Sequence, residues 1–84
     1  MDIEQKVRNL IKKSLDDMDI ELVSVNYEKE NNKDFLRIVI DNENGVDLDT
    51  CVATTRVINK LLDDANIIED EYILDISSKE KGGN

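Results

Sequence analysis

Acidic side chains surround Gly45 in the segment IDNENGVDLDT, residues 40–50, and carboxylates are the ligands that a calcium ion prefers. An EF-hand loop needs oxygen ligands at its first, third and fifth positions, glycine at the sixth and glutamate at the twelfth. If the loop began at Asp41, Gly45 would fall one place early, and Val46 and Val52 would occupy the glycine and glutamate positions. The sequence therefore predicts no metal site here, and no other cofactor is expected.

A turn followed by a helix accounts for the same segment. Asn44-Gly45 is typical of a turn, because these residue types adopt positive φ more easily than others. Asp47 is expected to cap the following helix, and Asp49 in the first turn suits the positive end of the helix dipole. The segment is thus predicted to end a strand, reverse the chain and begin a helix.

The side chains that most enzymes use for catalysis are missing. The chain has no histidine, which excludes a Ser-His-Asp or Cys-His arrangement and a zinc site with imidazole ligands. Its single cysteine, Cys51, lies on the apolar side of a predicted helix and is expected to be a small core residue. There is no glycine-rich phosphate-binding loop. We therefore predict that the protein is not an enzyme.

The charge of the chain is strongly acidic. Its 84 residues carry 20 Asp and Glu against 11 Lys and Arg, for a net charge of −9. Such a surface repels phosphate backbones, so direct docking on DNA or exposed RNA is disfavoured, whereas a basic partner is attracted. The same charge also keeps a small domain in solution. No apolar run could span a bilayer and no signal-peptide pattern is present, which predicts a cytoplasmic protein with no membrane partner.

Two helices and three strands are expected from the spacing of apolar residues. Residues 2–18 and 47–65 show the helical period, and residues 20–28, 35–41 and 71–77 alternate as strands, with a polar turn over 29–34. The first helix is expected to bury Ile3, Val7, Leu10, Ile11, Leu15 and Met18. The second helix is expected to bury Leu48, Cys51, Val52, Thr55, Ile58, Leu61, Leu62 and Ala65.

The order α-β-β-α-β predicts an α+β fold, a two-layer sandwich in which both helices cover one face of a mixed three-stranded sheet in the order 1-2-3. The inward strand residues are expected to be Val23, Val25, Tyr27, Leu36, Ile38, Ile40, Tyr72, Leu74 and Ile76. The opposite face of the sheet would be open. On it, Phe35, Val39 and Ile73 would form a partly apolar strip beside Arg37 and Asp75.

One arrangement of the KH RNA-binding fold has the same element order. That fold clamps RNA through a GXXG loop, which this sequence lacks. Of the three aromatic residues, Tyr27 and Tyr72 are expected on the core side, so no platform remains for stacking bases. A KH-like module that binds RNA directly stays an alternative, as does a structural half-domain that docks a missing partner domain through the open face.

A set of short motifs follows in a fixed order along the chain: Glu21-Leu22-Val23, Leu36-Arg37-Ile38, Ile40-Asp41, Gly45-Val46, Leu48-Asp49, Cys51, Leu62-Asp63, Tyr72, Leu74 and Ser77-Ser78. Through this ordered set the chain resembles the N-terminal domain of the ribosome maturation factor RimP family over about residues 3–78. No single motif is sufficient for the resemblance. The family's glycine before the first strand is replaced by Met18-Asp19, and aspartate is expected to tolerate left-handed geometry there.

The resemblance implies a cytoplasmic bacterial factor that assists maturation of the small (30S) ribosomal subunit. It implies binding to a basic ribosomal protein near the decoding centre, with at most indirect contact with ribosomal RNA. Residues 1–78 would form the α/β domain and residues 79–84 a flexible tail, with the family's second, β-barrel domain absent. The acidity and the resemblance together make Asp47, Asp49, Asp75, Ser77 and Ser78 the expected partner-binding residues.

Overall fold

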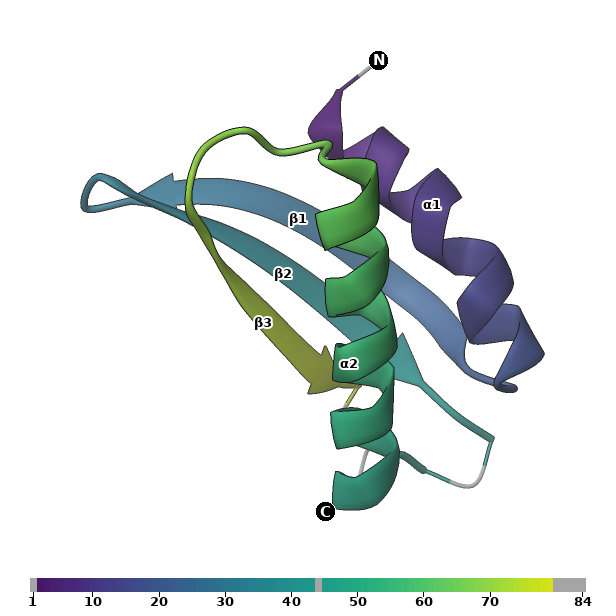
Figure 1. Cartoon of the computed structure of the whole chain (residues 1–84). Coiled ribbons are helices and arrows are strands. Elements are labelled where there is room, and N and C mark those ends of the chain that lie inside the picture. Colours follow the sequence, from purple (N-terminus) through teal and green to yellow (C-terminus); the bar gives the residue numbers. More distant parts are fainter. Residues whose placement is uncertain (1, 44, 80–84) are drawn as a thin grey trace.

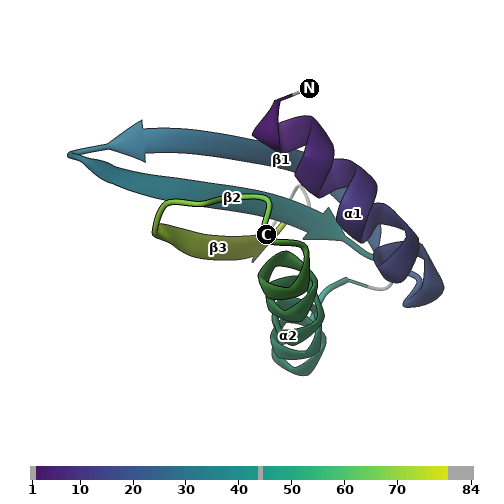
Figure 2. The ribbon, with the colours of Figure 1, turned by 45° about the horizontal axis from the view of Figure 1, so that its top comes forward.

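The five predicted elements form in the predicted order in a computed structural model, which describes residues 2–43 and 45–79. Strands β1 and β2 are antiparallel, β2 and β3 are parallel, and the sheet order is β1-β2-β3. Both helices lie on one face of this sheet (Figure 1), and Figure 2 shows α1 beside β1 and α2 beside β3. The α+β sandwich is confirmed. Its elements are α1 (Ile3–Asp17), β1 (Glu21–Glu30), β2 (Lys33–Asp41), α2 (Leu48–Ala65) and β3 (Tyr72–Ser78).

The core lies between the helices and the sheet, and β2 runs through its centre. The inward side chains of β2 are Leu36, Ile38 and Ile40, each with no exposed surface. From the helices, the most buried apolar side chains are Val7, Ile11, Leu15, Ile58 and Leu62. The predicted inward faces of α1, β2 and β3 are confirmed, because alternation in a strand and the 3.6-residue period of a helix each leave one apolar side.

The predicted faces of β1 were wrong at two positions, because Val23 was expected on the inward face and Leu22 on the opposite face. The pairing register shifts between Leu22 and Ser24, so that Leu22 stands opposite Ile40 while Val23 is the extra residue of a β-bulge. An extra residue reverses the alternation on one side of the bulge. Leu22 therefore packs against the core with Val25, and Val23 does not take the inward place expected of it.

The apolar stripe of α2 was also predicted too wide. Leu48 is 78% exposed, Val52 is 45% exposed, and Ala65 at the end of the helix is exposed as well. At 3.6 residues per turn, Val52 lies roughly 120° around the helix axis from the buried Ile58, which turns it away from the sheet. The centre of the stripe includes Thr54 instead, which has no exposed surface.

The chain reverses direction through left-handed residues at both ends of β1. Asp19 has φ 59°, which confirms the expectation that aspartate holds a left-handed conformation before β1. The β1–β2 turn is shorter than predicted, because only Asn31 and Asn32 stand between the strands, with φ 51° and 67°. Two consecutive left-handed residues are typical of a type I′ hairpin turn.

The predicted tail is described only at its first residue. The backbone N–H of Lys79 donates to the Ile40 carbonyl at 2.8 Å, which extends the pairing of β3 with β2 by one hydrogen bond. Residues 80–84 of the expected tail, and Asn44 of the expected turn, lie outside the described residues.

The hydroxyl of Tyr27 in β1 donates a hydrogen bond to Asp34 Oδ2 in β2 at 2.7 Å, which links the two strands of the hairpin. Burial, together with this hydrogen bond and the charge of Asp34, raises the pKa of Tyr27 from 10.0 to about 12. The folded protein therefore favours the neutral phenol. The corresponding stabilisation is complete below the unfolded pKa of 10.0 and is lost as the pH rises to about 12.

The Tyr27→Phe variant is accordingly expected to be less stable than the parent at pH 8, by an amount that shrinks between pH 10 and 12. Urea unfolding of both proteins at pH 8, 10, 11 and 12 measures this difference. The parent minus variant difference isolates Tyr27, because burial also raises the pKa of Tyr72 and both proteins share that tyrosine. A difference that stays constant or grows with pH would contradict the role assigned to the Tyr27 hydroxyl.

Candidate partner-binding surface

The face of the sheet opposite the helices is open and carries alternate residues from all three strands. The strip predicted there is confirmed, with Ile73 43% exposed and Phe35 and Val39 half-buried. The strand register arranges the face in three cross-strand rows, which are Glu28–Phe35–Ile73, Asn26–Arg37–Asp75 and Ser24–Val39–Ser77. An apolar strip bordered by charged groups is typical of a surface that contacts another molecule.

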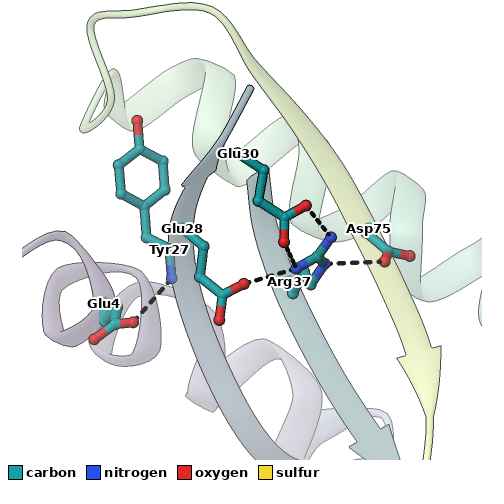
Figure 3. Close-up of polar contacts among 6 residues, drawn as sticks. All are labelled: Glu4, Tyr27, Glu28, Glu30, Arg37 and Asp75. Atoms are coloured by element: carbon teal, nitrogen blue, oxygen red, sulfur yellow. Dashed lines mark hydrogen bonds and ion pairs between the residues drawn. The ribbon is translucent and has the colours of Figure 1, made fainter. Parts of the chain in front are cut away.

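Arg37 stands at the centre of the open face among three carboxylates (Figure 3). Its Nη1 lies 2.7 Å from Glu28 Oε2, its two terminal nitrogens lie 3.2 and 3.3 Å from the Glu30 oxygens, and its Nε lies 3.8 Å from Asp75 Oδ2. The guanidinium also lies 4.9 Å from the centre of the Phe35 ring. Hydrogen bonding to Arg37 lowers the pKa of Glu30. One cation facing three anions leaves this part of the face negative.

Asp75 and Ser77, two of the five predicted site residues, lie on this open face. Ser78 stands opposite Ile40 in the register, so it belongs to the side of the sheet that the helices cover, although it is exposed. Of the three carboxylates around Arg37, that of Asp75 is the most distant, at 3.8 Å. Asp75 is therefore the member of the group most available to a partner.

Asp47 and Asp49, the other acidic members of the predicted set, lie at the start of α2. Asp47 Oδ1 accepts the backbone N–H of Thr50 at 2.8 Å, which confirms the predicted helix cap, and hydrogen bonds from Thr50 hold the pKa of Asp47 below its ordinary value. Asp49 is exposed in the first turn. Gly45 has φ 86°, as the predicted turn requires.

The two groups of predicted residues lie toward the same end of the domain. The thiol of Cys51, in the first turns of α2, lies 3.9 Å from the carbonyl oxygen of Ile76 near the end of β3. The start of α2 and the end of β3 are accordingly neighbours (Figure 1). The structure thus places exposed acidic and hydroxyl side chains from two separate elements toward the same end of the domain, with Asp47 and Asp49 on the helix side and Asp75 and Ser77 on the open face.

Comparison with known protein families matches residues 10–79 with the RimP N-terminal domain. The chain belongs to the RimP N-terminal domain family. The match runs from the second half of α1 to the residue after β3, so it includes the whole RimP sheet and α2. RimP is a ribosome maturation factor, so membership of the family connects this domain with ribosome maturation.

Two absences within residues 2–43 and 45–79 bear on the RimP domain. In this part of the chain no three His, Cys, Asp or Glu side chains are grouped so that they could hold a metal ion. Neither helix described there is long and apolar enough to cross a membrane.

Proposed function

We propose that this RimP-family domain is a non-catalytic cytoplasmic module that assists maturation of the small ribosomal subunit by binding a basic ribosomal protein. Asp47, Asp49, Asp75, Ser77 and Ser78 are the proposed contacts. The observation that carries the proposal is the membership of an acidic chain, with net charge −9, in a family of ribosome maturation factors.

Electrostatic complementarity supports a basic protein as the partner. Asp49 and Asp75 are exposed carboxylates toward the same end of the domain, and Ser77 offers a hydroxyl beside Asp75 on the open face. Charges at the rim of an interface mainly speed the encounter of the partners and select among them. Ribosomal RNA would be repelled by the same carboxylates, which supports a protein as the direct contact.

A pull-down with purified small-subunit ribosomal proteins tests the proposal. The Asp47→Asn/Asp49→Asn/Asp75→Asn variant removes three charges, and asparagine still caps a helix well, so the fold is expected to persist. We expect retention of a basic ribosomal protein to fall about tenfold at low salt, since each exposed ion pair contributes roughly 0.2–1 kcal/mol. Raising the salt concentration should reduce the difference in retention of the ribosomal protein between parent and variant, because salt screens the charges.

A matched variant, Asp16→Asn/Asp17→Asn/Asp19→Asn, removes the same number of charges around the end of α1. It should retain the ribosomal protein nearly as well as the parent. If the Asp47→Asn/Asp49→Asn/Asp75→Asn variant retained the ribosomal protein as well as the parent does, the proposed surface would be wrong. Tight retention of small-subunit ribosomal RNA fragments by the parent, weakening steeply with salt, would instead support a domain that binds RNA directly.

A further inference from the structure

The direction of the hydrogen bonds along β3 determines which of its backbone groups face away from the sheet. Lys79 donates its N–H to the carbonyl of Ile40, and Ser78 stands opposite Ile40 in the parallel register. In a parallel ladder the residues on either side of Ser78 therefore bond to β2, and Ser78 directs its own N–H and C=O outward. Because this direction alternates along a strand, the earlier outward-facing residues of β3 are Tyr72, Leu74 and Ile76.

On each outer edge of the sheet a side chain contacts one outward backbone group, by a short hydrogen bond on the β1 edge and by a long thiol contact on the β3 edge. On the β1 edge, the outward N–H of Tyr27 donates to Glu4 Oε2 of α1 at 2.8 Å (Figure 3). On the β3 edge, the carbonyl of Ile76 is the only outward group with a partner among the residues that the structure describes, and that partner is the thiol of Cys51 at 3.9 Å. Within residues 2–43 and 45–79, nothing pairs with the outward N–H and C=O groups of Tyr72 and Leu74. An edge with unpaired backbone groups accepts a further strand.

A groove of about 490 Å³ runs beside this unpaired edge, between α2 and β3. It is bounded by Asn59 and Asp63 of α2, by the following loop, and by Tyr72 and Leu74 of β3. Three charged residues line it, and all are exposed acids: Asp63, Asp70 and Glu71. The groove thus combines an unpaired strand edge, a partly apolar floor and a wholly negative border.

We propose that the outer edge of β3, at Tyr72 and Leu74, binds an extended polypeptide segment carrying lysine or arginine side chains, which adds to the sheet as a fourth strand. The edge supplies backbone hydrogen bonds that do not depend on sequence, and Asp63, Asp70 and Glu71 select a cationic segment. A second copy of this chain is disfavoured as the occupant, because pairing two such edges would bring like charges together.

This edge is a different surface from that of Asp47, Asp49 and Asp75. The proposal rests on the proposed function only in taking a basic protein as the natural partner. Its test uses synthetic peptides rather than ribosomal proteins, so either idea can fail without the other.

Titration of the ¹⁵N-labelled full chain with a ten-residue peptide of alternating lysine and valine tests the fourth strand. The amides of Leu74 and Ile76 point outward, so we expect their hydrogen exchange to slow at least tenfold when the peptide binds. The amides of Asp75 and Ser77 already bond to β2 and should change little. A peptide of the same sequence with N-methylated central residues keeps its charge but cannot pair, and it should bind at least tenfold more weakly.

The Asp63→Asn/Asp70→Asn/Glu71→Gln variant should bind the lysine–valine peptide about tenfold more weakly, since it loses three exposed charges and keeps the edge. The Asp16→Asn/Asp17→Asn/Asp19→Asn variant, matched in charge, should bind it like the parent. Equal binding of the N-methylated peptide would overturn the proposal, because attraction would then be electrostatic alone. Protection of Leu74 that appears without peptide as protein concentration rises would also overturn it, by identifying a second copy as the occupant.

Discussion

Replacing Ile38 with alanine is expected to lower the free energy of unfolding by about 3–4 kcal/mol, within the range measured for large-to-small changes in protein cores. Ile38 has no exposed surface and lies in the middle of β2, opposite Val25 on one side and Ile76 on the other. The change removes three carbons and leaves a cavity that packed neighbours on both strands and both helices cannot readily fill. A domain of 84 residues buries a small core, so this loss is a large part of its stability.

Urea unfolding followed by circular dichroism measures the loss, with Val39→Ala as the control. Val39 is the next residue along β2 but lies on the open face and is half-buried, so its truncation should cost about 1 kcal/mol or less. The contrast between neighbouring positions tests whether the core lies on one side of the sheet. Equal costs for the two substitutions would contradict a sheet covered by helices on a single face.

The second large effect is expected at the hairpin turn, where the Asn31→Ala/Asn32→Ala variant should be less stable than the parent by about 2 kcal/mol. Both residues hold left-handed φ values, 51° and 67°. That conformation costs an ordinary L-residue roughly 1–2 kcal/mol, because Cβ crowds the following carbonyl oxygen. Asparagine tolerates it better, since its short polar side chain can hydrogen-bond locally.

The Asn31→Gly/Asn32→Gly variant is the control for the turn. Glycine has no Cβ and adopts left-handed φ without strain, so this pair should lie within about 1 kcal/mol of the parent. Thermal unfolding of the three proteins under one set of conditions gives the comparison. If the alanine pair were as stable as the glycine pair, the two-residue type I′ turn would be incorrect.

Periodicity predicted the element order and most of the inward-facing residues. The alternation Leu36, Ile38, Ile40 leaves one possible apolar face for β2, and the helical spacing of Val7, Ile11 and Leu15 does the same for α1. Both patterns are local, because they depend on how a single element presents its side chains. Capping is local as well, which is why Asp47 could be assigned to the start of α2 from its position in the sequence.

The errors arose where pairing or packing between elements decides the outcome. The residue types in the run Leu22-Val23-Ser24 do not predict a bulge, because a bulge is defined by how β1 pairs with its partner strand β2. Thr54 was passed over in favour of the adjacent Thr55, which lies on the same side of the helix as Leu48 and Val52. The hydroxyl of Thr54 donates to the Thr50 carbonyl at 2.7 Å within the same helix, which allows the side chain to be buried without an unsatisfied donor.

The candidate surface was predictable only in part, for the same reason. Phe35, Val39 and Ile73 follow from alternation, but the carboxylates around Arg37 require the hairpin register. A two-residue turn places Glu30 opposite Lys33 and Glu28 opposite Phe35, which brings both glutamates to Arg37. The longer polar turn expected from the sequence could not have located these contacts. The partner contacts themselves stay predictions that rest on charge and on the resemblance.

The parallel pairing of β3 with β2 has a consequence for the order of events during folding. Helix α1 and the β1–β2 hairpin join residues close in sequence, whereas β3 reaches β2 only across the whole of α2. Closing so long a segment costs entropy before any compensating contact forms. While a ribosome translates this chain, one side of the central strand β2 therefore stays unpaired until β3 has emerged.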